Sequence, residues 1–179
     1  MYGLPAITVP DNISSNLKPW APSSITYDVT EDAVMWAVDG DDDRSVAFAA
    51  RLMEQDVQVR VIDKQSILSN HNLSRGSITV IKMDNPQYKD LLTVVRKTAE
   101  DLGISIVSIE SGFGIEDLPD WGGRHFRLLQ KPQIAILSHS DFSSYDVGVT
   151  WWSIDQYLGI RHSQVNSSMA GYADLRRYN

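Results

Sequence analysis

The chain has 179 residues, no cysteine and a net charge of −7 at pH 7. The lack of cysteine excludes disulfides, cysteine-ligated zinc and cysteine nucleophiles, and the length suits one good-sized domain or two small ones. The acidic balance without a basic stripe argues against binding to nucleic acid or to an anionic membrane surface, and no apolar run is long enough to span a membrane.

Residues 1–30 carry no regular hydrophobic period. Pro5, Pro10, Pro19 and Pro22 interrupt any long helix or strand, because proline fixes its own φ and lacks a backbone N–H. We therefore expect an irregular N-terminal arm that connects the folded part of the chain to a preceding domain.

The stretch from Val34 to Met53 predicts a strand, a sharp acidic loop and a helix. The apolar run at 34–38 is typical of a strand buried on both faces, and it ends at the DGDDD loop, residues 39–43. After the loop the apolar residues follow the helical spacing of i, i+3, i+4 and i+7. Alternating valines in residues 57–63 then predict a return strand, which completes a βαβ unit with a parallel crossover.

Further predicted elements extend this α/β unit over residues 31–110. Residues 64–76 are expected to form a loop, and residues 77–83 and 104–110 two more strands. Asp84-Asn85-Pro86 is a typical helix start, because it offers cap residues followed by proline in the first turn. Gly103 is a typical helix end.

The segment 111–132 is long and rich in glycine, proline and aspartate, so we expect it to connect two units. Residues 133–179 repeat the pattern, with a strand at 133–138, a helix at 145–158 and a return strand at 160–165. The predicted fold class is α/β, with repeated βαβ units, a mainly parallel sheet and an incomplete second unit. A lone βαβ leaves a sheet edge and a helix face uncovered, so this unit either completes the first sheet or belongs to a longer polypeptide.

Six segments together carry a resemblance: PWAPSSITYDV, MWAVDGDDDRSVAFAARLM, LSRGSITVIKMDN, DLPDWGGRHFRLLQKPQIAIL, TWWSIDQYLGIRHS and ADLRRYN. They resemble the region C-terminal to the catalytic domain in bacterial carboxypeptidase A-type zinc peptidases. In that group this region contains a class I glutamine amidotransferase-like domain. The resemblance implies a flavodoxin-like or amidotransferase-like fold whose first βαβ is residues 133–179.

The same resemblance implies a structural or regulatory role in a metallocarboxypeptidase whose zinc and catalytic residues lie elsewhere. The expected partners are the peptidase domain of the same polypeptide and a second copy of the chain, and the parent protein would be periplasmic or secreted. The family's zinc signature is His-x-x-Glu with a distant histidine. The residues three positions after the four histidines are Ser74, Leu128, Phe142 and Val165. We therefore expect no cofactor and no peptidase or amidotransferase chemistry in this segment.

The DGDDD loop has three interpretations. Asp42 or Asp43 could cap the following helix, whose N-terminus favours carboxylates. The clustered carboxylates could instead bind a divalent cation. In the third interpretation Asp39 and Asp41 are the nucleophile and acid/base of a small Mg²⁺-dependent phosphatase of the haloacid dehalogenase type, which is the alternative function.

The remaining ligand or interface candidates are Arg44, directly after this loop, Arg124 and His125 in the sequence WGGRHF, and His139. Arg124 and His125 could bind a carboxylate or phosphate, or the stretch could be a structural turn that aromatic residues fix to the core. His139 follows a buried strand at its C-terminal end, where open α/β sheets bind ligands. In the pair Trp151-Trp152 we expect one ring to point inward and the other toward a partner surface.

Overall fold

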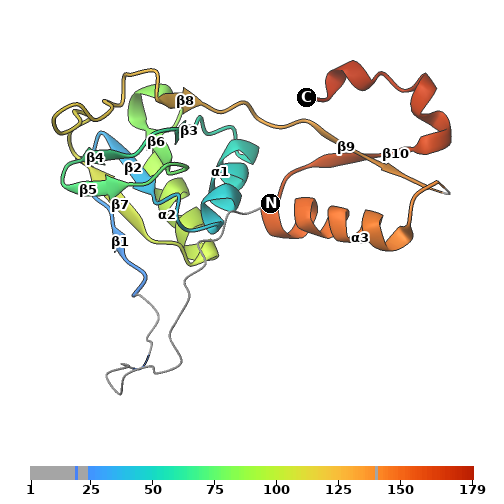
Figure 1. Cartoon of the computed structure of the whole chain (residues 1–179), viewed down its shortest axis with the longest axis horizontal. Coiled ribbons are helices and arrows are strands. Elements are labelled where there is room, and N and C mark those ends of the chain that lie inside the picture. Colours follow the sequence, from blue (N-terminus) through green and yellow to red (C-terminus); the bar gives the residue numbers. More distant parts are fainter. Residues whose placement is uncertain (1–18, 20–23, 140) are drawn as a thin grey trace, which may run out of the picture.

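The computed structural model describes residue 19 and residues 24–139 and 141–179, which form two α/β units with separate sheets (Figure 1). The strands of the first unit are β1 (Tyr27–Asp28), β2 (Met35–Val38), β3 (Arg60–Ile62), β4 (Ser66–Leu68), β5 (His71–Leu73), β6 (Ile78–Ile81), β7 (Ile106–Ile109) and β8 (Phe126–Leu128). Its helices are α1 (Arg44–Glu54) and α2 (Leu91–Leu102). The second unit contains β9 (Ile134–Ser138), α3 (Ser144–Trp152) and β10 (His162–Asn166).

The main sheet has the strand order β1-β7-β2-β6-β3-β8. In the part of the chain that the structure describes, only β1 and β7 of this sheet pair in parallel, and the four other pairs are antiparallel. The prediction of a mainly parallel sheet is therefore wrong for this unit. Strands β2 and β3 do run in the same direction, as α1 requires, but β6 lies between them. The same holds for β6 and β7, which are connected by α2 and separated by β2. This interleaving of two crossovers is the split βαβ, or ferredoxin-like, arrangement.

Both faces of this sheet are covered. Side chains alternate across a strand, so Trp36 and Val38 of β2 pack under the helices while Met35 and Ala37 point to the other face. Figure 1 shows α1 and α2 on one side and the β4–β5 hairpin on the other. Phe48 of α1 is fully buried in the helix-side cluster. This double cover explains why β2 is a continuous apolar run.

Four local predictions need correction. The expected loop at 64–76 contains the β4–β5 hairpin, and α2 begins at Leu91 behind the cap Asp90, after a short 3₁₀ turn, Lys82–Asp84. The connection at 111–132 contains β8, which pairs with β3. The arm at 1–30 contributes β1 to the sheet edge, while its other residues, apart from Pro19 and those from 24 on, lie outside the described part of the chain.

The second unit is a βαβ with a parallel pair, as predicted. Strands β9 and β10 pair in parallel over five residues each, and α3 continues as a π-helical segment, Ser153–Leu158, that ends at Gly159. This pair forms a sheet of its own and does not extend the first one. Within the described ranges, no helix combines the length and apolar character needed to cross a bilayer.

Candidate functional site

The DGDDD loop lies at the end of β2, and its first carboxylate is used inside the loop. Asp39 is half-buried, and its Oδ1 accepts a hydrogen bond from the backbone N–H of Asp41 at 3.2 Å. It lies 3.5 Å from Ser77 Oγ, whose single hydrogen is better placed for the carbonyl of Ser74 at 2.7 Å. Asp41 is exposed to solvent. A Cβ on Gly40 would lie 2.4 Å from backbone atoms of Gly76 and Ser77, so only glycine allows the loop to approach β6 this closely.

Asp42 and Arg44 form the start of α1. The Asp42 carboxylate accepts from the Arg44 backbone N–H at 3.0 Å and from the guanidinium at 2.8 Å, which lowers the pKa of Asp42 and raises that of Arg44. Arg44 also donates to the carbonyl of Gly103 at 2.5 Å, and a cation is favourable at that helix C-terminus. Asp43 is the N-cap residue of α1 and makes no side-chain cap hydrogen bond, so the expected capping is met only in part, by Asp42 one residue before it. Arg44 joins the beginning of α1 to the end of α2.

His125 has a carboxylate partner that the sequence did not reveal. Its Nδ1 lies 2.7 Å from Asp63 Oδ1, and its carbonyl accepts from the backbone N–H of Asp63 at 3.0 Å. A carboxylate in this position fixes the orientation of the imidazole ring. Asp63 is the last residue of the predicted strand 57–63, and only the pairing of β3 with β8 places it beside His125. Arg124, the neighbour of His125, is exposed.

The strand register places several of these groups at one end of the sheet, where β2 and β3 end and β6 and β8 begin. Val38 pairs with Ile78, and the backbone N–H of Ile62 donates to the carbonyl of Ser77 at 2.9 Å. This end of the sheet therefore carries, from one strand to the next, Asp39, Ser77, Asp63 and His125. Among the described residues, no group of three or more His, Cys, Asp or Glu side chains is placed to hold a metal ion.

His139 belongs to a different place. It directly follows β9 in the second unit with a φ of 98°, and its carbonyl accepts from the backbone N–H of Phe142 at 2.9 Å. It lines a hollow of about 490 Å³ together with Trp151 and Gln164. The structure therefore does not combine His139 with Asp39 or His125.

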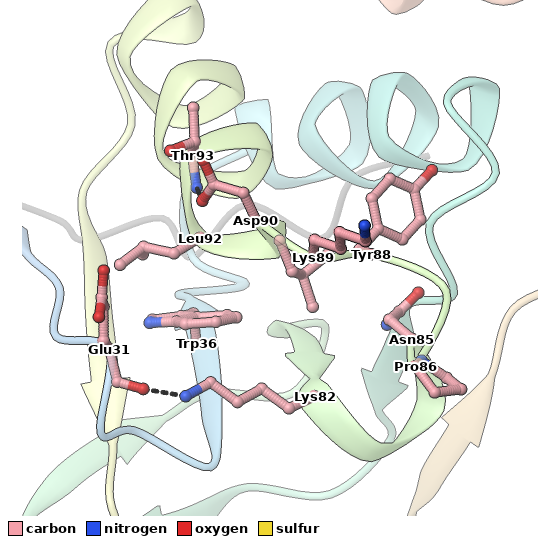
Figure 2. A pocket seen from close by; sticks show the side chains of 11 residues that line it. Glu31, Trp36, Lys82, Asn85, Pro86, Tyr88, Lys89, Asp90, Leu92 and Thr93 are labelled. Atoms are coloured by element: carbon pink, nitrogen blue, oxygen red, sulfur yellow. Dashed lines mark hydrogen bonds between the residues drawn. The ribbon is translucent and has the colours of Figure 1, made fainter.

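A further hollow, of about 480 Å³, lies at the opposite end of the sheet, where β6 ends and α2 begins (Figure 2). Lys82 crosses its floor, donates to the backbone carbonyl of Glu31 and lies 5.3 Å from the centre of the Trp36 ring. Figure 2 shows Lys89 and Tyr88 on the α2 side. Position 85 was expected to start a helix, and instead it forms the buried end of this hollow.

Asn85 is a structural residue. It is 2% exposed, accepts from the backbone N–H of Gln58 at 2.7 Å, and donates to the carbonyls of Gln58 at 2.9 Å and Ile81 at 3.0 Å. These bonds hold Gln58, which leads into β3, against the end of β6, and they give the buried amide of Asn85 its hydrogen-bond partners. The hollow of Figure 2 is therefore polar at its base, and its lining includes the charged side chains of Glu31, Lys89 and Asp90.

A scan against family models, a search of curated proteins and a search of solved structures each gave no match to the chain.

Helix α3 presents an apolar stripe to solvent. Tyr145, Val149 and Trp152 are 87%, 68% and 57% exposed. Their spacing of i, i+4 and i+7 places them on one face of the helix. We expected one ring of the pair Trp151-Trp152 to point inward and the other outward. The exposures agree, because Trp152 is exposed and Trp151 is half-buried. None of the residues of α3 is fully buried.

Proposed function

We propose that the chain is the non-catalytic, accessory α/β region of a bacterial zinc carboxypeptidase-type protein. In this proposal it packs against the peptidase domain of the same polypeptide, and the parent's proteolysis takes place there. The observation that carries the proposal is the stripe of Tyr145, Val149 and Trp152, an apolar face that a helix normally buries against another element. The resemblance of the six quoted segments supplies the identity of the expected partner.

The second unit supports the same proposal from its topology. A parallel βαβ such as β9-α3-β10 is the repeating unit of flavodoxin-like and amidotransferase-like sheets. We infer that residues 133–179 are the first repeat of such a domain. A sheet of this type has helices on both faces, so the apolar surface of the repeat would be covered when the domain is complete.

Two of the four carboxylates of the DGDDD loop make contacts that serve the fold. Asp39 accepts from the backbone N–H of Asp41 and closes the turn, and Asp42 binds Arg44 at the start of α1. In the alternative function Asp39 is the nucleophile and Asp41 the acid/base. Asp39 Oδ1 is hydrogen-bonded within its own loop, whereas the Asp41 side chain is exposed. These contacts favour the accessory role over the alternative Mg²⁺-dependent phosphatase.

An enzymatic comparison separates the two functions. The purified chain, assayed with added Zn²⁺ on a peptide with a free C-terminus, should release no C-terminal residue, and with Mg²⁺ it should not hydrolyse p-nitrophenyl phosphate. Release of a C-terminal residue would overturn the accessory role. Mg²⁺-dependent phosphatase turnover that disappears in Asp39→Asn but persists in the exposed control Asp43→Asn would establish the alternative.

The reading frame that encodes the chain gives a second test. We expect a domain with the His-x-x-Glu signature upstream and an apolar strand downstream. Mixed with that upstream domain, the chain should form a complex that Trp152→Ser weakens and that Val46→Ser, an exposed apolar residue of α1, leaves unchanged. A reading frame without a zinc peptidase domain would refute the proposal.

A further inference from the structure

The first unit contains a second hollow, of about 520 Å³, on the face of the sheet opposite the helices. Its floor consists of Met35 and Ile81, which are fully buried. Around them stand the apolar side chains of Val34, Met83 and Phe113, which are 39%, 78% and 76% exposed. A contiguous apolar depression that remains open on a folded unit is a typical interaction surface.

The walls of this hollow are fixed by the fold. Trp121 lines it, and its backbone N–H donates to the carbonyl of Gly112 at 3.0 Å. The indole lies directly on the backbone of Gly112, where an added Cβ would be 1.6 Å from Trp121 Cδ1. The next turn is closed by Asp120, whose Oδ1 accepts from the backbone N–H of Gly114 at 2.6 Å. A ligand would therefore meet a largely preformed shape, which reduces the entropy lost on binding.

The charges around the hollow select the type of ligand. Asp32 and Glu110, both exposed, stand on the side formed by β2 and β7. Among the described residues that line the hollow the one lysine, Lys82, is turned to the other face of the sheet, where it contacts Glu31 and Trp36 (Figure 2). The rim is therefore acidic. It favours a cation beside the bound apolar group and repels the carboxylate of a fatty acid.

We propose that this hollow binds a peptide segment that presents an apolar side chain beside a lysine or arginine. The unbranched, polarizable side chain of Met83 can adapt to such a segment, and Phe113 and Trp121 offer aromatic contact area. This surface lies in the first unit, on residues that the role proposed for α3 does not use. The inference can therefore be tested independently of the proposed function.

Methionine methyl NMR tests the proposal with two matched probes, acetyl-Lys-Leu-Phe-Lys-amide and acetyl-Glu-Leu-Phe-Glu-amide. The basic peptide should shift the methyl signals of Met35 and Met83 and leave those of Met53 and Met169, which lie elsewhere, unchanged. It should bind about tenfold more tightly than the acidic peptide, because like charges would meet at the rim in the latter. The difference should shrink in about 1 M salt, where the screening length falls to about 3 Å.

Three variants make the outcome decisive. Phe113→Ser should weaken binding about tenfold by removing one wall, and Asp32→Asn with Glu110→Gln should abolish the preference for the basic peptide. The matched control Val46→Ser removes an exposed apolar residue elsewhere and should change neither. Equal affinity for the two peptides, shifts confined to Met53 or Met169, or tighter binding of decanol than of the basic peptide would each overturn the proposal. The last result would identify a small-molecule site in place of a peptide site.

Discussion

The two units of this chain are built from the same elements and differ in how completely they are buried. In the first unit both faces of the sheet have an apolar cluster, one under α1 and α2 and one under the β4–β5 hairpin. Among the described residues of the second unit, only Ile136 and Ile160 are buried apolar residues, and α3 has none. Burial of apolar surface is the dominant favourable term in folding, so the first unit should hold most of the stability and the second should depend on what it contacts.

The largest test of this comparison removes the same side chain from each unit. Phe48→Ala in α1 empties a fully buried position, and we expect the free energy of unfolding to fall by about 3–5 kcal/mol. Phe142→Ala in the second unit removes a ring that is 45% exposed, and its effect should stay below about 1 kcal/mol. Urea unfolding followed by circular dichroism measures both. Similar losses for the two variants would show that the second unit has a core of comparable weight.

A pair of glycines offers the next test. Gly40→Ala places a methyl group 2.4 Å from backbone atoms of Gly76 and Ser77, which lead into β6. These atoms cannot move without breaking the turn, so the variant should destabilise the chain by about 3 kcal/mol. Gly148→Ala lies in the middle of α3 with no atom within 4 Å of the new Cβ. It should be neutral or should stabilise the helix by about 0.5–1 kcal/mol. Thermal unfolding of the two variants would contradict the comparison if Gly148→Ala proved the more damaging.

The contacts between the units form the third test. Glu54 at the end of α1 pairs with Arg161 and lies 3.9 Å from Lys131, and Arg51 donates to the carbonyl of Tyr157 at 3.1 Å. Arg161 is largely exposed, so the double-mutant cycle of Glu54→Ala and Arg161→Ala should give a coupling of about 0.5–1 kcal/mol.

Hydrogen exchange locates the effect of breaking this contact. Glu54→Ala should accelerate exchange in β9 and β10 while β2 and β6 keep their protection, because the buried clusters of the first unit are untouched. The control pair Arg96 and Glu100, 2.8 Å apart on the surface of α2, should have no effect on the second unit when it is removed. Loss of protection in both units together would mean that they unfold as one.

How much of the fold could be predicted depends on the range of the interactions. The strand at β2, the end of α2 at Gly103 and the βαβ of the second unit follow from local spacing and cap residues, and all were predicted. The strand order was not, because the insertion of β6 between β2 and β3 depends on contacts between distant segments. A strand that is buried on both faces has a continuous apolar sequence whether its neighbours are parallel or antiparallel. Here the β4–β5 hairpin provides the second cover.

The candidate site shows the same limit. A carboxylate contact at the start of α1 was predicted for Asp42 or Asp43, and Asp42 makes it with Arg44, two residues away. The pairing of His125 with Asp63 spans 62 positions in the sequence and needed the register of β3 and β8. The start of α2 was misplaced because Asn85, which fits a cap by residue type, uses its amide to hold Gln58 instead, while Asp90 accepts from the backbone N–H of Thr93.

The smallest expected effect compares two copies of one local motif, Asp-x-Arg. In each copy, Asp42 with Arg44 and Asp174 with Arg176, the carboxylate accepts from the backbone and guanidinium of the arginine, which lowers its pKa. A lowered folded-state pKa contributes stability above the unfolded value of about 3.9, and this contribution is lost as the pH falls through the folded pKa. Asp42→Asn should therefore remove part of the loss of stability seen below about pH 4.

The two copies should differ, because Arg44 also bonds the carbonyl of Gly103, whereas Asp174 and Arg176 are both largely exposed. We expect Asp42→Asn to lower the free energy of unfolding at pH 7 by at most about 1 kcal/mol and Asp174→Asn to leave it unchanged. Urea midpoints measured at pH 7 and pH 3 for the two variants check this difference. If Asp174→Asn changed the pH dependence as much as Asp42→Asn, the second unit would be stabilised by its own surface pairs, and its stability would not depend on the contacts it makes.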